Sequence, residues 1–573
     1  MTEQFRFLPI AKRLASYQAS NFNGDLLAGV IVAIMLIPQA MAYAMLAGLP
    51  PEIGLYASML PLIIYGLFGS SNFLSVGPVA ITSLLVAATI AETNVSGTSG
   101  GAVAVGLMLA LLSGAILLTM GLARLGFLIN FISHPVIIGF VSAAAILIAL
   151  SQLEHILGLN IPKDVSTLEI LPYVVANVNL VNITTLAIGL SSIILLLLTD
   201  RPLAAMLLRF GVAANIITII GKLGPILVIV LGVASVTFFS LDQTQAVAIT
   251  GTIPAGLPQI SVRQFDFSIV QQLIVPALVI SLVGFVESIS VAKALASKRR
   301  QKVDANQELL ALGMANLSAS VTGACPVTGG FSRSAVNFSA GANSGLASII
   351  TAIFIAISLL FLTPWFYYLP KAVLAATIMV AIVKLIDIQG FIATWRYNKA
   401  DTASLITTFL SVLAVGIEAG IVAGILVSVC LYLLRTSMPH IAIVGRVGKS
   451  EHFRNVKHYD VEVYSDTLII RVDESLYFAN SRYLEDQLLA AASEHKKLKN
   501  IVLICSAVNF IDSSAVEALQ NLIIELRDSG VTFHFAELKI PVLRQLERSH
   551  LLNGLAPGKV FMSTHDAVQE LCK

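Results

Sequence analysis

The sequence predicts a multi-span α-helical membrane protein, built as two inverted halves of seven helices and followed by a cytoplasmic α/β domain. The 573 residues are 57% hydrophobic and 12% charged, with a mean hydropathy of +0.87. This composition is typical of integral membrane proteins. Charged residues become much denser after Pro439, which indicates a domain boundary there. Two apolar segments are interrupted by Gly and Pro at matching places in the two halves.

The apolar segments give the number of spans. A helix needs about 20 apolar residues to cross a bilayer, and the first 440 residues contain about fourteen such segments, two of them short and broken. They lie near 26–47, 52–69, 75–91, 102–123, 127–150, 180–198, 222–240, 270–294, 305–322, 330–342, 347–364, 370–386, 402–417 and 420–436. We expect a cytoplasmic segment at 1–23, a transmembrane domain at 24–438 and a cytoplasmic domain at 439–573.

Lys and Arg indicate the orientation of the chain. They gather in alternate connections between spans, as in the run Lys298–Lys302. Under the positive-inside rule, this places both termini in the cytoplasm. The polar segment Met1–Asn23 lacks the apolar core of a cleavable signal peptide.

Charge and cysteine content argue against several classes of function. The net charge of +2 gives no indication of nucleic acid or acidic partners. The four cysteines have no metal-binding or disulfide spacing, so we expect free thiols, no metal and no cofactor.

The two broken segments are the third span of each half. In the first, Gly77–Pro78 ends an extended piece, and Pro78 suits the first turn of a helix. The second is CPVTGGFSRSAVN. Paired interruptions of this kind indicate an inverted-repeat transporter with a site at the membrane midplane. The amino terminus of each half-helix carries about +0.5 charge and therefore attracts anions.

Arg333 lies within the second interruption, in the polar stretch Ala324–Gly345. A cation near the bilayer centre costs roughly 2.5–3.5 kcal/mol on insertion scales, so it usually faces a cavity. Irregular backbone at that depth must be buried in protein or line a water-filled space. We expect Arg333 and the half-helix to hold an anion. The alternative is a surface loop with a snorkelling arginine.

These segments resemble the SulP anion-transporter family of sulfate permeases and anion exchangers. The resemblance covers nearly the whole chain and is carried by GDLLAGVIVAIMLIPQAMAYAMLAGLPPEIGLYAS at 24–58, SVGPVAITSLL at 75–85, VESISVAKALASKRRQKVDANQEL at 286–309, PVTGGFSRSAVN at 326–337 and NFIDSSAVEAL at 509–519. It implies fourteen spans in a core domain and a gate domain, with a C-terminal STAS domain. It also implies an anion site between the third and tenth helices.

The resemblance also implies the residues of that site. Carried over by position, the substrate pocket falls on Gln39, Tyr43, Val79, Ala80, Gly330, Ser332 and Arg333. Gln39 and Tyr43 are one helical turn apart and face the same way. The alternatives are a hydrogen bond within the bundle for Gln39 and interfacial or core packing for Tyr43.

Glu287 is the second unusual charge, in the middle of an apolar segment. A carboxyl group shielded from water is stabilised in its neutral form, so it could exchange a proton. It resembles the coupling carboxylate of proton-coupled sulfate permeases. Sodium-coupled bicarbonate members place a second acid where this chain has Val291, which weakens a sodium interpretation. The alternative is a salt bridge with Arg333 or Lys293.

The tail shows alternating strands and helices. We expect strands near 459–464, 467–472, 500–505 and 531–536, and helices near 480–495, 513–529 and 541–550. Asp512 or the serines after it should cap a helix. Ser514 resembles a phosphorylated serine of small STAS proteins, and regulatory phosphorylation there is the alternative to capping. Asp512, His534 and these serines suggest a catalytic triad, but no nucleophile elbow supports one.

Together these features predict a non-enzymatic secondary anion transporter. The favoured function is sulfate uptake by proton symport, with an elevator-like movement of the core, in a homodimer of a bacterial inner membrane. Alternatives within the family are a sodium-coupled bicarbonate or dicarboxylate transporter and a chloride/bicarbonate exchanger. An anion channel or a STAS-based signalling protein would be a different class.

Overall fold

The computed structural model describes residues 9–10, 17–93, 99–127, 133–162, 165, 169–200, 224–254, 256–258, 267–383, 385–495 and 497–572. Most of the expected segment 1–23 and parts of the expected spans 127–150 and 222–240 lie outside these residues. The chain divides into two compact units, Met1–Leu426 and Val427–Lys573. Each unit is described by itself.

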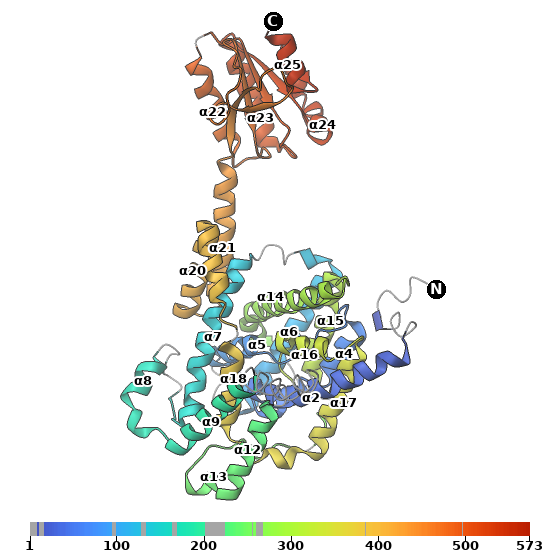
Figure 1. Ribbon diagram of the computed structural model, residues 1–573, viewed down its shortest axis with the longest axis vertical. Helices are drawn as coiled ribbons and strands as arrows, with labels where there is room; N and C mark the ends of the chain where they lie inside the picture. The colour runs from blue at the N-terminus through green and yellow to red at the C-terminus, as the bar shows by residue number, and fades with distance from the viewer. Residues whose placement is uncertain are drawn as a thin grey trace, which may run out of the picture. The chain divides into compact units, whose positions relative to one another are not determined.

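The first unit is a bundle of helices (Figure 1). In the described part of the chain, its longer helices are α2 (Ala19–Leu46), α6 (Ser99–Leu122), α7 (His134–Leu157), α9 (Ile183–Asp200), α12 (Gly224–Phe239), α14 (Phe267–Lys298), α15 (Ala305–Val321), α17 (Leu346–Phe361), α20 (Lys399–Ala414) and α21 (Ile417–Ser437), the last of which runs on into the second unit. Shorter helices are α3 (Pro51–Tyr56), α4 (Leu60–Phe68), α5 (Ala80–Glu92), α8 (Ile170–Ala176), α13 (Leu241–Thr244), α16 (Phe331–Ser339), α18 (Lys371–Val383) and α19 (Ile388–Tyr397).

Each expected span contains one of these helices, and the expected fold class is confirmed. Seven helical stretches of the described chain are long and apolar enough to cross a membrane, and two of them, Pro51–Phe68 and Lys371–Tyr397, each run over two of these helices. Others are shorter apolar helices. The span expected at 127–150 instead forms α7, which ends at Leu157. Hydropathy falls at Ser151–His155, but the backbone stays helical up to Gly158, whose positive φ of 63° ends the helix.

A two-stranded antiparallel ladder joins the two interrupted segments. Strand β1 (Val76–Gly77) pairs with β2 (Thr328–Gly329), so the chain enters α5 and α16 side by side. The N–H of Gly330 donates to the carbonyl of Ser75 at 3.1 Å. The backbone N–H of Ser75 donates to the Ser334 hydroxyl at 2.9 Å. The irregular backbone is therefore satisfied within the protein, as its depth requires.

Helices on either side hold β2 in place. Asn316 of α15 accepts from the N–H of Val327 and donates to its carbonyl, both at 2.9 Å. Ser288 of α14 accepts from the N–H of Gly329 at 2.8 Å and shares a hydrogen bond with Thr328. These contacts connect α14, α15 and both strands into one scaffold.

Glycines allow close helix contacts elsewhere in the bundle. Helix α4 meets the start of α17 at Gly66 and Gly345, where a Cβ added to Gly345 would lie 2.1 Å from the Gly66 carbonyl oxygen. Helices α6 and α15 meet in the same way at Gly114 and Gly313. Small residues serve this purpose in membrane bundles, where helices associate largely through close packing.

The second unit is a six-stranded sheet with helices on both faces (Figure 1). The strand order is β4-β3-β5-β6-β7-β8, with β5 to β8 parallel. Helices α22, α23 and α24 cover one face, and α25 covers the other. The strands are β3 (Ile441–Arg446), β4 (Phe453–Asn455), β5 (Thr467–Val472), β6 (Asn500–Ile504), β7 (Thr532–Ala536) and β8 (Val560–Phe561), and the helices are α22 (Ser481–Glu494), α23 (Ser513–Asp528), α24 (Ile540–Arg548) and α25 (Thr564–Leu571).

The expected elements of the tail from 467 to 550 are confirmed, whereas the strand expected at 459–464 is wrong. That segment forms a single bridge, between Arg446 and Glu462. Strand β3 pairs with β4 on one side, and its first three residues pair with β5 on the other. Only the end of β3 is left for a further partner, and Arg446 there pairs with Glu462 alone. Each of the four cysteines is a free thiol.

The contact between α4 and α17 yields a prediction about stability. Gly345→Ala should lower the unfolding free energy by about 1–3 kcal/mol, because its methyl group meets rigid backbone rather than a movable side chain. The measurement is the melting temperature in detergent. Gly106→Ala is the matched control, since its methyl would meet only the end of Leu49, at 3.3 Å. Equal melting temperatures for the two variants would contradict the close contact.

Candidate functional site

A cavity of about 500 Å³ lies in the first unit and brings together every residue of the expected pocket. Gln39 and Tyr43 come from α2, and Glu287 comes from α14. The remaining residues stand at the starts of α5 and α16: Val79, Ala80, Gly330, Ser332 and Arg333. These residues are far apart in the sequence, and the β1–β2 ladder places the two helix starts next to each other.

The other wall of this cavity was missed by sequence reasoning. It includes Leu196 and Thr199 of α9, Pro225 of α12 and Thr377 of α18. These residues stand in continuous apolar helices, and nothing in their spacing distinguishes them from core or lipid-facing positions. Ser288 and Asn316, which hold β2, were missed for the same reason.

Two helix amino termini open into the cavity without side-chain caps. Val79 and Gly330 are the N-cap residues of α5 and α16, and neither helix has a side-chain cap hydrogen bond. The first intrahelical bonds are made by the N–H groups of Ser83 and Ser334. The N–H groups before them are the orphan donors of a helix start. They add partial positive charge to this part of the cavity.

The guanidinium of Arg333 is buried with part of its hydrogen-bonding capacity unused. The residue is 2% exposed, and its Nη1 donates to the carbonyl of Pro78 at 2.6 Å. Nε and Nη2 have no hydrogen-bond partner among the described residues. These two nitrogens form the side-on edge of the guanidinium, where two N–H groups point the same way. A buried donor without a partner costs about 1–3 kcal/mol.

Glycines shape the place where this guanidinium lies. A Cβ added to Gly330 would lie 2.9 Å from Nη2 of Arg333 and 3.0 Å from its Cζ. A Cβ added to Gly77 would lie 3.4 Å from Nη2. The backbone at both positions is therefore close to the charged group, and a side chain at Gly330 would displace it.

Glu287 lines the same cavity. Its Oε2 is buried and has no hydrogen-bond partner within the described residues. Neither Arg333 nor Lys293 forms a salt bridge with it among the described residues, so the structural ion pair considered as an alternative is not seen. The carboxyl group and the guanidinium thus face one cavity separately.

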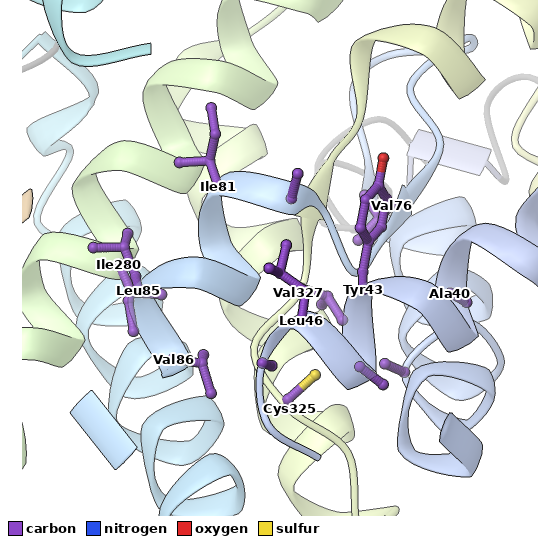
Figure 2. Close-up of a cluster of buried hydrophobic side chains, with 14 of the residues drawn as sticks. Ala40, Tyr43, Leu46, Val76, Ile81, Leu85, Val86, Ile280, Cys325 and Val327 are labelled. Atoms are coloured by element: carbon purple, nitrogen blue, oxygen red, sulfur yellow. The ribbon is translucent and has the colours of Figure 1, made fainter. Parts of the chain in front are cut away.

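Tyr43 extends from α2 beside Val76, and its hydroxyl points away from the apolar side chains of Leu46 and Cys325 (Figure 2). The residue is 8% exposed, and its ring packs with the apolar core while it also lines the cavity. Core packing and a place at the cavity wall are therefore compatible for this residue.

The residues of interest in the second unit lie apart from one another. Asp512 caps α23 by accepting from the N–H of Ala515, and its other oxygen accepts from the N–H of Phe478, both at 2.8 Å. His534 instead contacts Asn500 and the N–H of Lys559, and burial lowers its pKa. Asp512 and His534 therefore do not form a triad. Ser514 is exposed in the first turn of α23.

The chain matches the sequence profile of the Sulfate permease family over residues 22–408 and that of the STAS domain over residues 458–567. Among curated proteins, it is 38% identical to "Sulfate transporter 4.1, chloroplastic" of Arabidopsis thaliana, over 98% of this chain and 82% of the relative. It is 31% identical to "High affinity sulfate transporter 2" of Stylosanthes hamata, over 98% of this chain and 85% of the relative.

Solved structures of the same fold are also found. Murine Solute Carrier 26 family member A9, an anion transporter in the inward-facing state, aligns with a TM-score of 0.91 at 26% identity, covering 99% of this chain and 94% of that one. The transmembrane domain of a cyanobacterium bicarbonate transporter, BicA, aligns with a TM-score of 0.59 at 23% identity, covering 72% of this chain and 98% of that one.

These relatives support a multi-pass membrane protein with a STAS domain. The expectation of a bacterial inner membrane is contradicted by the plant origin of the curated relatives.

Gly330→Ala tests the geometry of the site. The added methyl should displace the Arg333 guanidinium and weaken sulfate binding about tenfold, or about 1.4 kcal/mol. The fold should persist, because the methyl meets a side chain rather than backbone. Isothermal titration with sulfate and the melting temperature in detergent measure the two effects, with Gly106→Ala as the control. Unchanged affinity would place the bound anion away from this guanidinium.

Proposed function

Since this chain belongs to the Sulfate permease family, we propose that it is a secondary active transporter that carries sulfate together with a proton. The supporting observation is the guanidinium edge of Arg333. Its two adjacent, buried N–H donors have no partner in the part of the chain that the structure describes, and they line a cavity with two uncapped helix amino termini.

The guanidinium edge favours an oxyanion over a halide. Two parallel N–H groups match two oxygens of one sulfate, carboxylate or bicarbonate, and this bidentate contact adds both energy and orientation. A spherical ion accepts from the same two donors without such a geometric match. The side chains of Gln39, Tyr43 and Ser332 supply further donors around the remaining oxygens.

The charge of the cavity favours a divalent anion. Each helix amino terminus contributes about +0.5 and Arg333 contributes a full charge, which gives roughly +2. Sulfate would balance this charge. The curated relatives are named sulfate transporters, which supports the same substrate.

Glu287 is proposed as the proton-binding group. It lines the substrate cavity, and among the described residues it forms no ion pair and its Oε2 has no hydrogen-bond partner. An arriving dianion would disfavour the charged carboxylate further, so anion and proton should bind with positive coupling. Protonation would then accompany the reorientation of the loaded protein.

A sodium-coupled bicarbonate or dicarboxylate transporter and a chloride/bicarbonate exchanger are the alternatives within the family. Sodium prefers several oxygen ligands, and the position expected to supply a second acid is Val291, which is 6% exposed and apolar. An anion channel would not need Glu287. A signalling protein anchored in the membrane would need no anion cavity.

The contacts within the bundle suggest which parts move. The strands β1 and β2 and the helices that hold them carry Glu287, Arg333 and both helix starts. The opposite wall comes from α9, α12 and α18. We propose that the first group moves as a core against the second, in an elevator-like cycle.

The same proposal covers assembly and domain organisation. We propose that the chain comprises a cytoplasmic segment at 1–23, the transport domain at 24–438 and a cytoplasmic STAS domain at 439–573. Both termini lie in the cytoplasm, and two chains form a homodimer. Phosphorylation of the exposed Ser514 would have a regulatory role.

Arg333→Lys tests the bidentate contact. Lysine keeps the charge but offers a single point of contact, so sulfate affinity should fall at least tenfold while the protein stays folded. Isothermal titration with sulfate is the measurement, with Arg396→Lys, an exposed position on α19, as the matched control. Full affinity in Arg333→Lys would show that the guanidinium edge does not hold the anion.

Glu287→Gln tests proton coupling. Glutamine mimics the neutral carboxyl, so sulfate binding and sulfate–sulfate exchange should persist, while accumulation driven by an inward proton gradient should disappear. In the native protein, lower external pH should increase sulfate uptake, because proton and anion binding favour each other.

Uptake of labelled sulfate into proteoliposomes measures these effects. Glu92→Gln, at the exposed end of α5, is the matched control. Proton-driven accumulation that survives in Glu287→Gln, or native uptake that ignores pH and follows sodium, would reject this role.

A further inference from the structure

The turn after α16 contacts two other helices that carry residues of the anion cavity. This junction, residues 341–344, follows the half-helix of Arg333. Asp25 of α2 contacts it from one side, and Arg299, which directly follows α14, contacts it from the other. Both α2 and α14 also line the cavity. The junction therefore connects three of the elements that form the polar part of the site.

The contact with α2 is made by a buried carboxylate. Oδ1 of Asp25 accepts from the backbone N–H groups of Asn343 and Ser344, at 2.6 and 3.1 Å. Oδ2 accepts from the hydroxyl of Ser344 at 2.6 Å and from that of Tyr17 at 2.8 Å. Asp25 is 0% exposed. Hydrogen bonds to a charged acceptor are strong, so these four bonds fix the start of α2 against the junction.

The contact with α14 is made by a guanidinium. Nη1 of Arg299 donates to the carbonyl of Ala342 at 3.2 Å and to Oδ1 of Asn343 at 3.1 Å. The guanidinium also lies over the rings of Phe73 and Phe338, 5.1 and 5.0 Å from their centroids. Phe338 belongs to α16, and Phe73 precedes β1 and α5. One side chain thus connects α14 to both interrupted segments.

Arg299 gives α14 a second attachment to α16, far from the first. The first lies beside Glu287, where Ser288 accepts from the N–H of Gly329 just before α16. The two attachments are about 16 Å apart along α14, at 1.5 Å per residue. Neither Gly nor Pro lies between them, so the helix has no kink that would absorb a displacement. One attachment alone is a pivot, whereas two fix the angle between the helices.

We propose that Arg299 is a positioning residue, which holds α14 and α16 at the angle that directs Glu287 and Arg333 into one cavity. Arg299 itself does not line this cavity. Among the described residues that do, the titratable or charged groups facing Glu287 are Tyr43 and Arg333. The inference rests on the proposed coupling of sulfate to a proton on Glu287. It adds that this coupling depends on a residue outside the cavity.

The pH dependence of the KM for sulfate tests this role. Coupling between two sites typically changes affinity by a factor of about 5 to 150, so the native KM should be clearly lower at acidic than at neutral external pH. In Arg299→Gln the angle is no longer fixed, and the two KM values should differ by less than about twofold. The melting temperature should stay close to the native one, because the attachment at Ser288 remains.

Uptake of labelled sulfate into proteoliposomes is the measurement. Arg300→Gln is the matched control, because it removes the same charge from the next, exposed position, and it should keep the native ratio of KM values. A merely structural role would lower the uptake rate equally at both pH values and leave the ratio unchanged. A native ratio in Arg299→Gln would therefore overturn the proposal. A native protein without any pH effect would instead reject the proton coupling itself, and this inference with it.

Asn343→Ala tests the same contact from the other side, and it decides the matter if Arg299→Gln does not fold. The change removes the Oδ1 acceptor of Arg299 but keeps the backbone N–H that donates to Asp25. The KM ratio should fall in the same direction as in Arg299→Gln. The double variant should behave like Arg299→Gln alone, because both changes break one contact. An unchanged ratio in Asn343→Ala, or additive effects in the double variant, would overturn the proposal.

Discussion

The buried charge of Arg333, which forms no ion pair among the described residues, is the constraint on which the transmembrane unit depends. It is 2% exposed and makes one hydrogen bond, to the carbonyl of Pro78. Two helix amino termini, each partly positive, open into the same cavity. Groups of like charge repel one another in a medium that screens weakly. An anion between them would make their arrangement favourable, so binding of the proposed substrate would stabilise what the empty protein holds by other means.

Those other means are backbone hydrogen bonds and close packing. The β1–β2 ladder, the clamp of Asn316 on Val327 and the contact of Ser288 with Gly329 fix the positions of both helix starts. Each of these bonds satisfies a backbone group that could find no water at that depth. The site is therefore rigid where it is charged. The opposite wall of the cavity is formed by α9, α12 and α18, which are apolar and contribute few polar contacts. Movement of the charged half of the site against this wall would therefore break few hydrogen bonds.

The sequence predicted the charged half of the site and missed the apolar half. Arg333, Glu287 and the two Gly/Pro interruptions could be found because each violates the rule that a membrane span is apolar and regular. Thr199 and Thr377 violate no rule, and only the tertiary structure places them at the cavity. The same logic applies to helix ends. Hydropathy ended α7 too early, because the turn signal at Gly158 lies beyond the last apolar run.

The separation of Glu287 from Arg333 has a physical consequence for a transport cycle. If the two were paired, each would satisfy the other, and the empty cavity would be the most stable state. Because the two groups do not form an ion pair, an anion would stabilise the guanidinium, and a proton would stabilise the carboxyl group. Glu287 also lies where the anion cavity meets a second cavity, whose other lining residues are apolar apart from Ser290. The charged form of Glu287 therefore has low-dielectric surroundings on one side and the anion site on the other. This arrangement would link the binding of a proton by Glu287 to the binding of an anion by Arg333.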